Sequence, residues 1–148
     1  MVQGERFDEE MNREPFPYAP ADIQVLLITH AHLDHVGRIP KLVKEGFRGV
    51  IYSTPQTKAL AELVLNDAAN ILALEAKQNG VVSLYDLNDV QVVFPLWKTI
   101  EYHERLDITP DISIFLKDAG HILGSAMVEV TAPPLGWEES LEEERSDE

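Results

Sequence analysis

The chain has 148 residues, 45% of them hydrophobic, which suits a single domain with one core. It contains no apolar stretch long enough to span a membrane, and its acidic N-terminus is unlike a secretory signal, so we expect a cytoplasmic protein without a membrane partner. The absence of cysteine excludes disulfides and thiolate metal ligands, and the net charge of −14 opposes nucleic-acid binding through clustered lysine and arginine.

The first half of the chain begins with a polar segment and continues with short elements. Residues 1–22 contain three prolines and no periodic pattern, which predicts an irregular leader. The apolar run in residues 23–29 predicts a strand that is buried on both faces. A short helix is expected from Pro40 to about Gly46, followed by a strand over Val50–Ser53.

The longest predicted helix follows that strand. Ser53 or Thr54 can cap it, Pro55 suits its first turn, and the helical pattern continues to about Lys77. Its apolar residues recur at helical spacing, which predicts that they form a core-facing side of the helix. These residues are Leu60, Leu63, Val64, Ala68, Ile71 and Leu74.

The second half of the chain is expected to contain one more helix and several strands. Asp86 can cap a shorter helix that stops before Pro95. Strands are predicted over residues 99–102, 112–117 and 126–130. Alternating strands and helices followed by a run of strands predict an α/β layered domain over residues 23–131, with a disordered acidic tail at 132–148.

The segment THAHLDHVG at residues 29–37 contains three of the five histidines. His30 and His32 are two residues apart, so their side chains leave the same face of an extended strand and can bind one metal ion. Asp34 and His35 follow in the next turn, where a carboxylate and an imidazole can reach a second ion. These ligand types suit zinc, with manganese or iron as alternatives.

His121 lies between two predicted strands in the segment AGHILGSA. The glycines on either side of it let the backbone turn tightly beside an ion. His121 would complete a set of three histidines with His30 and His32. Burying such a cluster together with an aspartate would be costly without a ligand, which favours a metal site.

Two other polar residues are interpreted separately. Asp118 precedes the His121 segment and either orients a ligand histidine or is a solvent-facing carboxylate at the end of a strand. His103 stands apart from both histidine segments, and we expect it to be an ordinary exposed residue.

The HxHxDH element with a distant single histidine resembles the hallmark of the metallo-β-lactamase superfamily. The stretch THAHLDHVGRIPKLVKEGFRGVIYSTPQT, with the later DAGHILGSA, is similar to the β-CASP branch of RNA-processing nucleases. The resemblance extends over about residues 22–131. It implies an α/β domain with a partial metallo-β-lactamase (αββα) fold, in which helices flank a mixed sheet.

The resemblance also implies roles for the site residues. His30, His32 and His121 match the ligands of one zinc ion, and Asp34 and His35 match ligands of the second. Asp34 and His35 are therefore the candidate catalytic residues, with Asp34 orienting the attacking water or taking up its proton. Two zinc ions about 3.5 to 4 Å apart would activate this water and stabilise the charged transition state of RNA cleavage.

The chain departs from the family pattern in three places. It has no counterpart of the Asp-Cys-Gly-like segment before the motif, of the Ser-Gly-Asp segment whose aspartate bridges both metals, or of the inserted domain with a late histidine. We therefore expect a fragment that binds one zinc ion or none and hydrolyses little by itself. An open sheet edge would favour a homo-oligomer or a complementing chain.

Three functions follow from these observations. The leading interpretation is a fragment of a zinc-dependent β-CASP-type ribonuclease, with RNA as the substrate of the complete enzyme. A hydrolase of a small ester or thioester is the first alternative, because metal ligands alone do not select a substrate. A non-catalytic metal-binding subunit that works through partners is the second.

Overall fold

The computed structural model describes residues 11–134, so most of the predicted acidic tail and the first ten residues of the leader lie outside the described residues. The described strands form two three-stranded sheets rather than one mixed sheet. The first sheet is parallel and consists of β1 (Val25–Leu27), β2 (Val50–Ser53) and β3 (Trp97–Thr99). The second is antiparallel and consists of β4 (Arg105–Asp107), β5 (Ser113–Asp118) and β6 (Ala126–Thr131). The predicted α/β class is confirmed.

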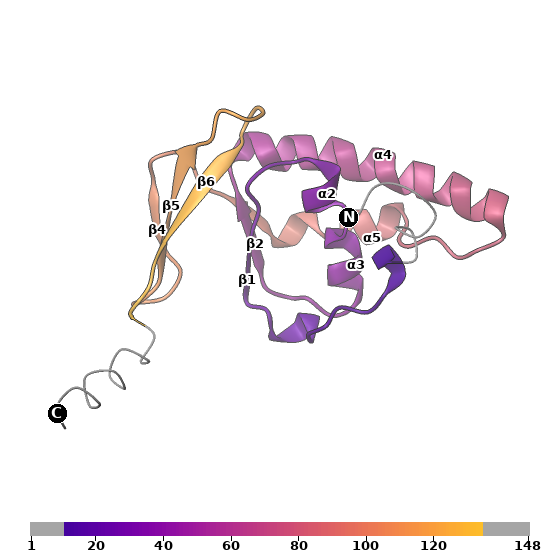
Figure 1. Ribbon diagram of the computed structural model, residues 1–148, viewed down its shortest axis with the longest axis horizontal. Helices are drawn as coiled ribbons and strands as arrows, with labels where there is room; N and C mark the ends of the chain where they lie inside the picture. Colours follow the sequence, from indigo (N-terminus) through magenta and orange to yellow (C-terminus); the bar gives the residue numbers. More distant parts are fainter. Residues whose placement is uncertain (1–10, 135–148) are drawn as a thin grey trace, which may run out of the picture.

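The helices lie on one side of the parallel sheet, and the antiparallel sheet lies on the other (Figure 1). The longest helix is α4 (Pro55–Asn79), which connects toward β3 through α5 (Leu87–Gln91) and the 3₁₀ helix η2 (Phe94–Leu96). Shorter helices precede β2; besides helical residues 11–13, they are η1 (Pro20–Asp22), α2 (Leu33–Val36) and α3 (Ile39–Lys44). No helix in the described part of the chain has the length and apolar character needed to cross a membrane.

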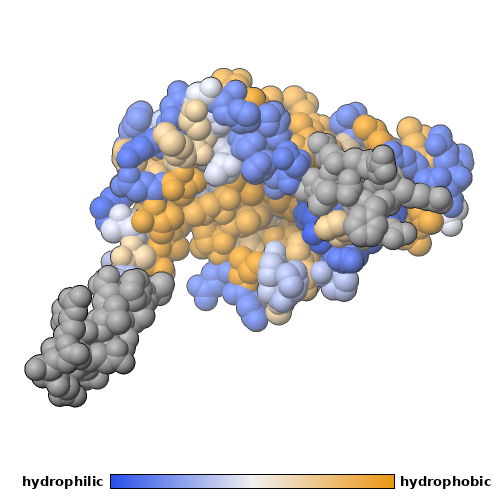
Figure 2. Space-filling model, viewed as in Figure 1, coloured by the Kyte–Doolittle hydropathy of each residue, from blue (hydrophilic) through white to orange (hydrophobic). Residues whose placement is uncertain are grey.

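Two hydrophobic cores hold these layers together. The first lies between the helices and the parallel sheet and contains Phe47, Ile51 and Leu65. The second lies between the two sheets, where Ile114 and Leu116 of β5 are buried against side chains of β1 and β2. Figure 2 shows apolar residues gathered where the two sheets face each other, near the centre of the view. Successive residues of β1 and β2 point to opposite faces, so both strands contribute to both cores.

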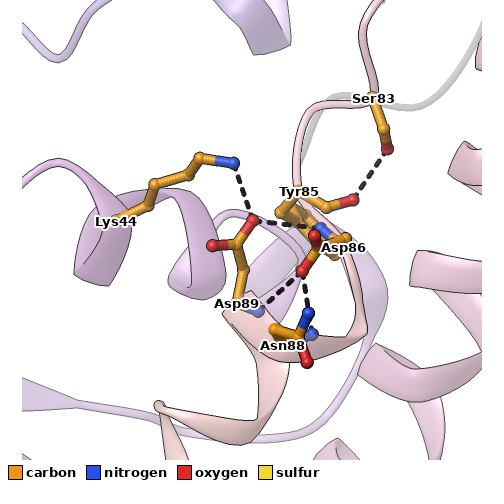
Figure 3. A network of polar contacts seen from close by, with 6 residues as sticks. All are labelled: Lys44, Ser83, Tyr85, Asp86, Asn88 and Asp89. Carbon is orange, nitrogen blue, oxygen red and sulfur yellow. Dashed lines mark hydrogen bonds and ion pairs between the residues drawn. The ribbon is translucent and has the colours of Figure 1, made fainter.

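The helix caps follow the sequence signals. The Thr54 hydroxyl accepts a hydrogen bond from the Thr57 N–H at the start of α4, and Gly80 ends this helix with a φ of 67°. Asp86 accepts from the N–H groups of residues 88 and 89 and so caps α5 as predicted. Figure 3 shows this cap and the ion pair between Asp89 and Lys44, which ties α5 to α3.

The predicted packing face of α4 is partly wrong. Leu63, Ile71 and Leu74 are 69%, 47% and 62% exposed, respectively. The helix packs instead mainly through Leu65 and a set of alanines, together with Leu60 and Val64 of the predicted face. The buried residues of α4 are Thr57, Ala61, Leu65, Ala68, Ala69 and Ala76.

Three further differences from the prediction have local causes. The strand expected at 99–102 lies at Trp97–Thr99, where the Trp97 indole N–H donates to the Ser53 hydroxyl at 2.9 Å. β4 was not predicted because only one of its three residues, Leu106, is partly buried. The prediction of an irregular leader does not hold for residues 11–13, which are helical, or for η1.

Candidate metal centre

The first two histidines lie in the segment that leaves β1. The Ile28 N–H donates to the Tyr52 carbonyl at 2.9 Å, which keeps this segment beside β2 for one residue beyond the strand. His30 is then buried, whereas His32 is exposed. The His32 carbonyl accepts hydrogen bonds from the His35 and Val36 N–H groups and so begins α2. Asp34 and His35 therefore lie in a short helix where we predicted a turn.

His121 lies in the loop between β5 and β6, and two side chains organise the backbone of that loop. The buried Ser125 hydroxyl oxygen accepts from the N–H groups of His121 and Ile122, both at 3.1 Å. A carboxylate oxygen of Asp118 accepts from the Gly120 N–H at 2.8 Å. Asp118 is exposed at the end of β5, which agrees with the interpretation as a solvent-facing strand carboxylate, and its described hydrogen bond is to the loop backbone rather than to a histidine ring.

The start of α4 fastens the same loop at Gly124. The hydroxyls of Thr54 and Thr57 both donate to the Gly124 carbonyl oxygen, at 2.6 and 2.8 Å. Gly124 has a φ of 81°, and a Cβ added to it would lie 2.6 Å from the Thr57 nitrogen. Only glycine fits this position, both in backbone conformation and in space.

The two histidine segments are also bound to each other directly. The Ala126 N–H donates to the Thr29 carbonyl at 2.7 Å. On the opposite side of the loop, the Tyr102 hydroxyl donates to the Ser125 carbonyl at 2.8 Å. These contacts place His121 beside His30 and His32 although the two segments are far apart in the sequence.

The donor atoms of His30, His32 and His121 lie within 4.8 Å of one another. Nδ1 of His32 is 3.2 Å from Nε2 of His121, and the three rings are nearly perpendicular in pairs, with centroids 4.8 to 4.9 Å apart. Nδ1 of His30 is 3.0 Å from the Thr29 hydroxyl, which leaves its Nε2 for an ion. This arrangement can hold a metal ion through three ring nitrogens.

Asp34 and His35 lie beside this cluster. The His35 ring is 4.0 Å from the His30 ring between centroids, and Nε2 of His35 is 3.6 Å from an Asp34 carboxylate oxygen. Both side chains are about half exposed. The structure thus brings all five predicted site residues together, but the converging set of donor atoms consists of three histidines.

The surroundings of His30 favour its neutral imidazole. Burial lowers the pKa of His30, the neighbouring His35, His32 and His121 lower it further, and only Asp34 opposes them. Metal ions bind the neutral form of histidine, so this environment suits a ligand. The donor set of three imidazoles without thiolate is compatible with zinc.

A family model described as the metallo-beta-lactamase superfamily domain matches residues 3–134. The chain belongs to the metallo-β-lactamase superfamily. The superfamily predicted from the histidine motif is therefore confirmed.

Named relatives of this metallo-β-lactamase chain are much longer than it is. Ribonuclease TTHA0252 of Thermus thermophilus is 38% identical over 128 residues, which are 86% of this chain and 27% of that protein. The transcription termination factor FttA of Methanosarcina mazei is 36% identical over 129 residues, 84% of this chain and 20% of the factor. FttA of Thermococcus kodakarensis is 43% identical over 107 residues, which are 72% of this chain and 16% of that factor. The chain thus spans about a quarter or less of the length of these relatives.

Among solved structures, Zn²⁺-bound PqqB from Methylobacterium extorquens is similar to this chain with a TM-score of 0.45 and 21% identity. The similarity covers 86% of this chain and 38% of PqqB.

Several residues of the metallo-β-lactamase site were not identified from the sequence. Thr54, Thr57 and Tyr102 hold the His121 loop from elements that precede it in the chain. Their contacts depend on tertiary structure, and no local motif indicates them. His103 is exposed and lies outside the histidine cluster.

Proposed function

We propose that this chain provides one zinc position of a metallo-β-lactamase hydrolase that cleaves RNA phosphodiester bonds within a longer β-CASP-type protein. The observation that carries the proposal is the convergence of His30, His32 and His121 on one point from two distant segments. The choice of RNA is supported by the relatives, which are named as a ribonuclease and as transcription termination factors.

In this proposal, three ring nitrogens hold the zinc ion: Nε2 of His30, Nδ1 of His32 and Nε2 of His121. Zinc in a site with three protein ligands supplies Lewis acidity and an activated water at neutral pH. With the ion on Nε2, Nδ1–H of His30 would donate to the Thr29 hydroxyl 3.0 Å away, and this hydrogen bond would fix the ring. The Thr29 hydroxyl is therefore part of the proposed zinc site, although it does not bind the ion itself.

Asp34 and His35 are proposed as the candidate catalytic residues and as ligands of a second zinc in the complete enzyme. The Asp34 carboxylate would orient the attacking water and accept its proton, and the adjacent His35 restricts its position. Because the converging donor atoms come from three histidines, we expect this chain to hold one zinc ion or none and to hydrolyse RNA weakly or not at all.

The open edges of both sheets bear on possible partners. Among the described strands, β1 and β3 are the edges of the parallel sheet and β4 and β6 those of the antiparallel sheet, and an edge strand without a partner can pair with another chain. We therefore keep a complementing chain or a homo-oligomer within the proposal. The cytoplasmic location expected from the sequence also stays a prediction.

A non-catalytic metal-binding subunit is the second candidate function. It is favoured by the exposure of the Asp34 and His35 side chains, each about half exposed. A small-ester hydrolase would use the same metal ligands, so RNA binding distinguishes it: binding to RNA weakens steeply with salt, and turnover of a neutral ester does not.

The first test is the zinc content of the chain, measured by elemental analysis after purification without chelator. We expect zinc in the parent, its loss in His121→Ala and its retention in the matched variant His103→Ala. Equal zinc in the parent and in His121→Ala would contradict the assignment.

The zinc-loaded chain and the longer protein that contains it are then assayed on labelled RNA and on a nitrophenyl ester. Cleavage of the ester alone would contradict the choice of RNA.

A further inference from the structure

An open pocket of about 410 Å³ adjoins the metal centre on the side of His121. This volume lies in the range of small-molecule sites, roughly 300 to 1,000 Å³. His121 lines the pocket and also belongs to the three-histidine cluster, so a group in the pocket would lie near an ion held by the cluster. The side chains that give the pocket its chemistry are Gln56, Tyr102, Asp118, Ile122 and Leu123.

The wall chemistry opposes a phosphate group. Among the described residues that line the pocket, none is lysine or arginine, and Asp118 adds a carboxylate. A phosphate would therefore be repelled. Tyr102 and the 69% exposed Leu123 supply aromatic and apolar surface, whereas Gln56 and Asp118 supply hydrogen-bonding groups. An uncharged ring with polar edges, such as a nucleobase, suits this combination.

Asp118 is placed to select among nucleobases. One of its carboxylate oxygens accepts from the Gly120 N–H, which fixes the side chain at the end of β5. An ionised carboxylate offers about four acceptor positions and no donor, so capacity remains for a ligand. It favours a base with an exocyclic amino group, whereas uracil offers only its N3–H, which lies between two carbonyl oxygens that the carboxylate would repel.

We propose that this pocket binds the nucleobase beside the scissile phosphate and that Asp118 favours adenine, cytosine or guanine over uracil. The inference rests on the proposed function for the identity of the polymer. Its binding step needs neither zinc nor hydrolysis, so it can fail or succeed independently of the metal assignment.

The test uses the metal-free chain of 148 residues and two phosphate-free nucleosides, cytidine and uridine, in ¹H–¹⁵N NMR titrations. We expect cytidine to shift the amide signals of Gly120 and Leu123 and to bind about tenfold more tightly than uridine, as one hydrogen bond to a charged group predicts. Asp118→Asn can still accept from the Gly120 N–H but presents a donor in place of the other oxygen. This variant should lose the preference or reverse it.

Asp111→Asn is the matched control, because Asp111 is exposed in the β4–β5 turn at the opposite end of β5 from Asp118. It should retain the preference of the parent. The inference is overturned if neither nucleoside shifts the pocket amides, if uridine binds as well as cytidine, or if Asp118→Asn behaves like the parent. Selective cytidine binding by a chain whose zinc content is unchanged by His121→Ala would support the pocket and contradict the metal assignment.

Discussion

The backbone N–H of Ala126 donates to the carbonyl oxygen of Thr29 at 2.7 Å, which joins the segment that precedes His30 to the segment that follows His121. Main-chain and hydroxyl contacts of this kind hold the three histidines together without the help of an ion. A site held in this way loses little conformational freedom when a metal binds. The contacts that fasten the His121 loop should therefore control zinc affinity.

Thr57→Val should weaken both the fold and the zinc site. The substitution keeps the shape of the side chain but removes the hydroxyl that donates to the Gly124 carbonyl. We expect the free energy of unfolding to fall by about 1 kcal/mol and zinc affinity to fall several-fold. Denaturant titration and competition with a zinc-binding dye measure the two effects. Thr57→Ser keeps the hydroxyl and should resemble the parent; if both variants bind zinc equally, the hydroxyl does not position the loop.

Gly124→Ala should be far more damaging than the same substitution at Gly80. Both glycines have positive φ, 81° and 67°, so each alanine carries a backbone penalty of roughly 1 kcal/mol. At Gly80 nothing lies within 4 Å of an added Cβ, whereas at Gly124 the Thr57 nitrogen would be 2.6 Å away. We expect Gly124→Ala to cost about 3 kcal/mol or more in thermal or chemical unfolding. Equal destabilisation by the two variants would show that the loop can move away from α4.

Ser125→Ala tests whether the loop backbone sets the position of His121. The Ser125 hydroxyl is buried and accepts from two backbone N–H groups, those of His121 and Ile122. Its removal leaves two donors without this acceptor and should cost about 2 kcal/mol of stability. Zinc affinity should fall about tenfold, as for other residues that support metal ligands. Ser113→Ala, in the buried part of β5, is the control; if it weakens zinc binding as much, the effect is not specific to the loop.

Local chemistry accounts for what the sequence predicted correctly. The cap formed by Asp86 and the short strand Val50–Ser53 are each determined by a few adjacent residues. The candidate ligands were identified because their residue types and spacing are unusual, and the structure brings His30, His32 and His121 together. Such features need no knowledge of the tertiary structure.

The features that were missed depend on contacts between distant segments. Two sets of residues on α4 recur at helical spacing, one with large side chains such as Leu63 and Leu74, and one dominated by alanines. Periodicity alone does not say which set packs, because the choice depends on how the helix is rotated against the elements it contacts. The bonds from Thr54 and Thr57 to Gly124 likewise carry no periodic signal.

Tyr85→Phe should leave the fold as stable as the parent at neutral pH or make it more stable. The Tyr85 side chain is fully buried in the first core, and its hydroxyl has no hydrogen-bond partner among the residues that the structure describes. A buried hydroxyl without a partner destabilises the folded state, and phenylalanine fills nearly the same volume. Thermal unfolding at pH 7 should therefore show an equal or higher Tm. A clear drop in Tm would mean that the hydroxyl is hydrogen-bonded after all.

The same variant should change the response of the protein to alkaline pH. Burial raises the pKa of Tyr85 from 10.0 to about 12, so the folded state keeps its proton where the unfolded state loses it. The contribution of this proton to the free energy of unfolding is therefore fully present below pH 10. The free energy of unfolding then falls by roughly 1.4 kcal/mol per pH unit as pH rises from 10 toward 12. Tyr85→Phe removes this loss, whereas Tyr18→Phe, at a half-exposed tyrosine, should not. Denaturation curves at pH 9, 10 and 11 compare the three proteins, and parallel losses in all of them would contradict the buried ionisation.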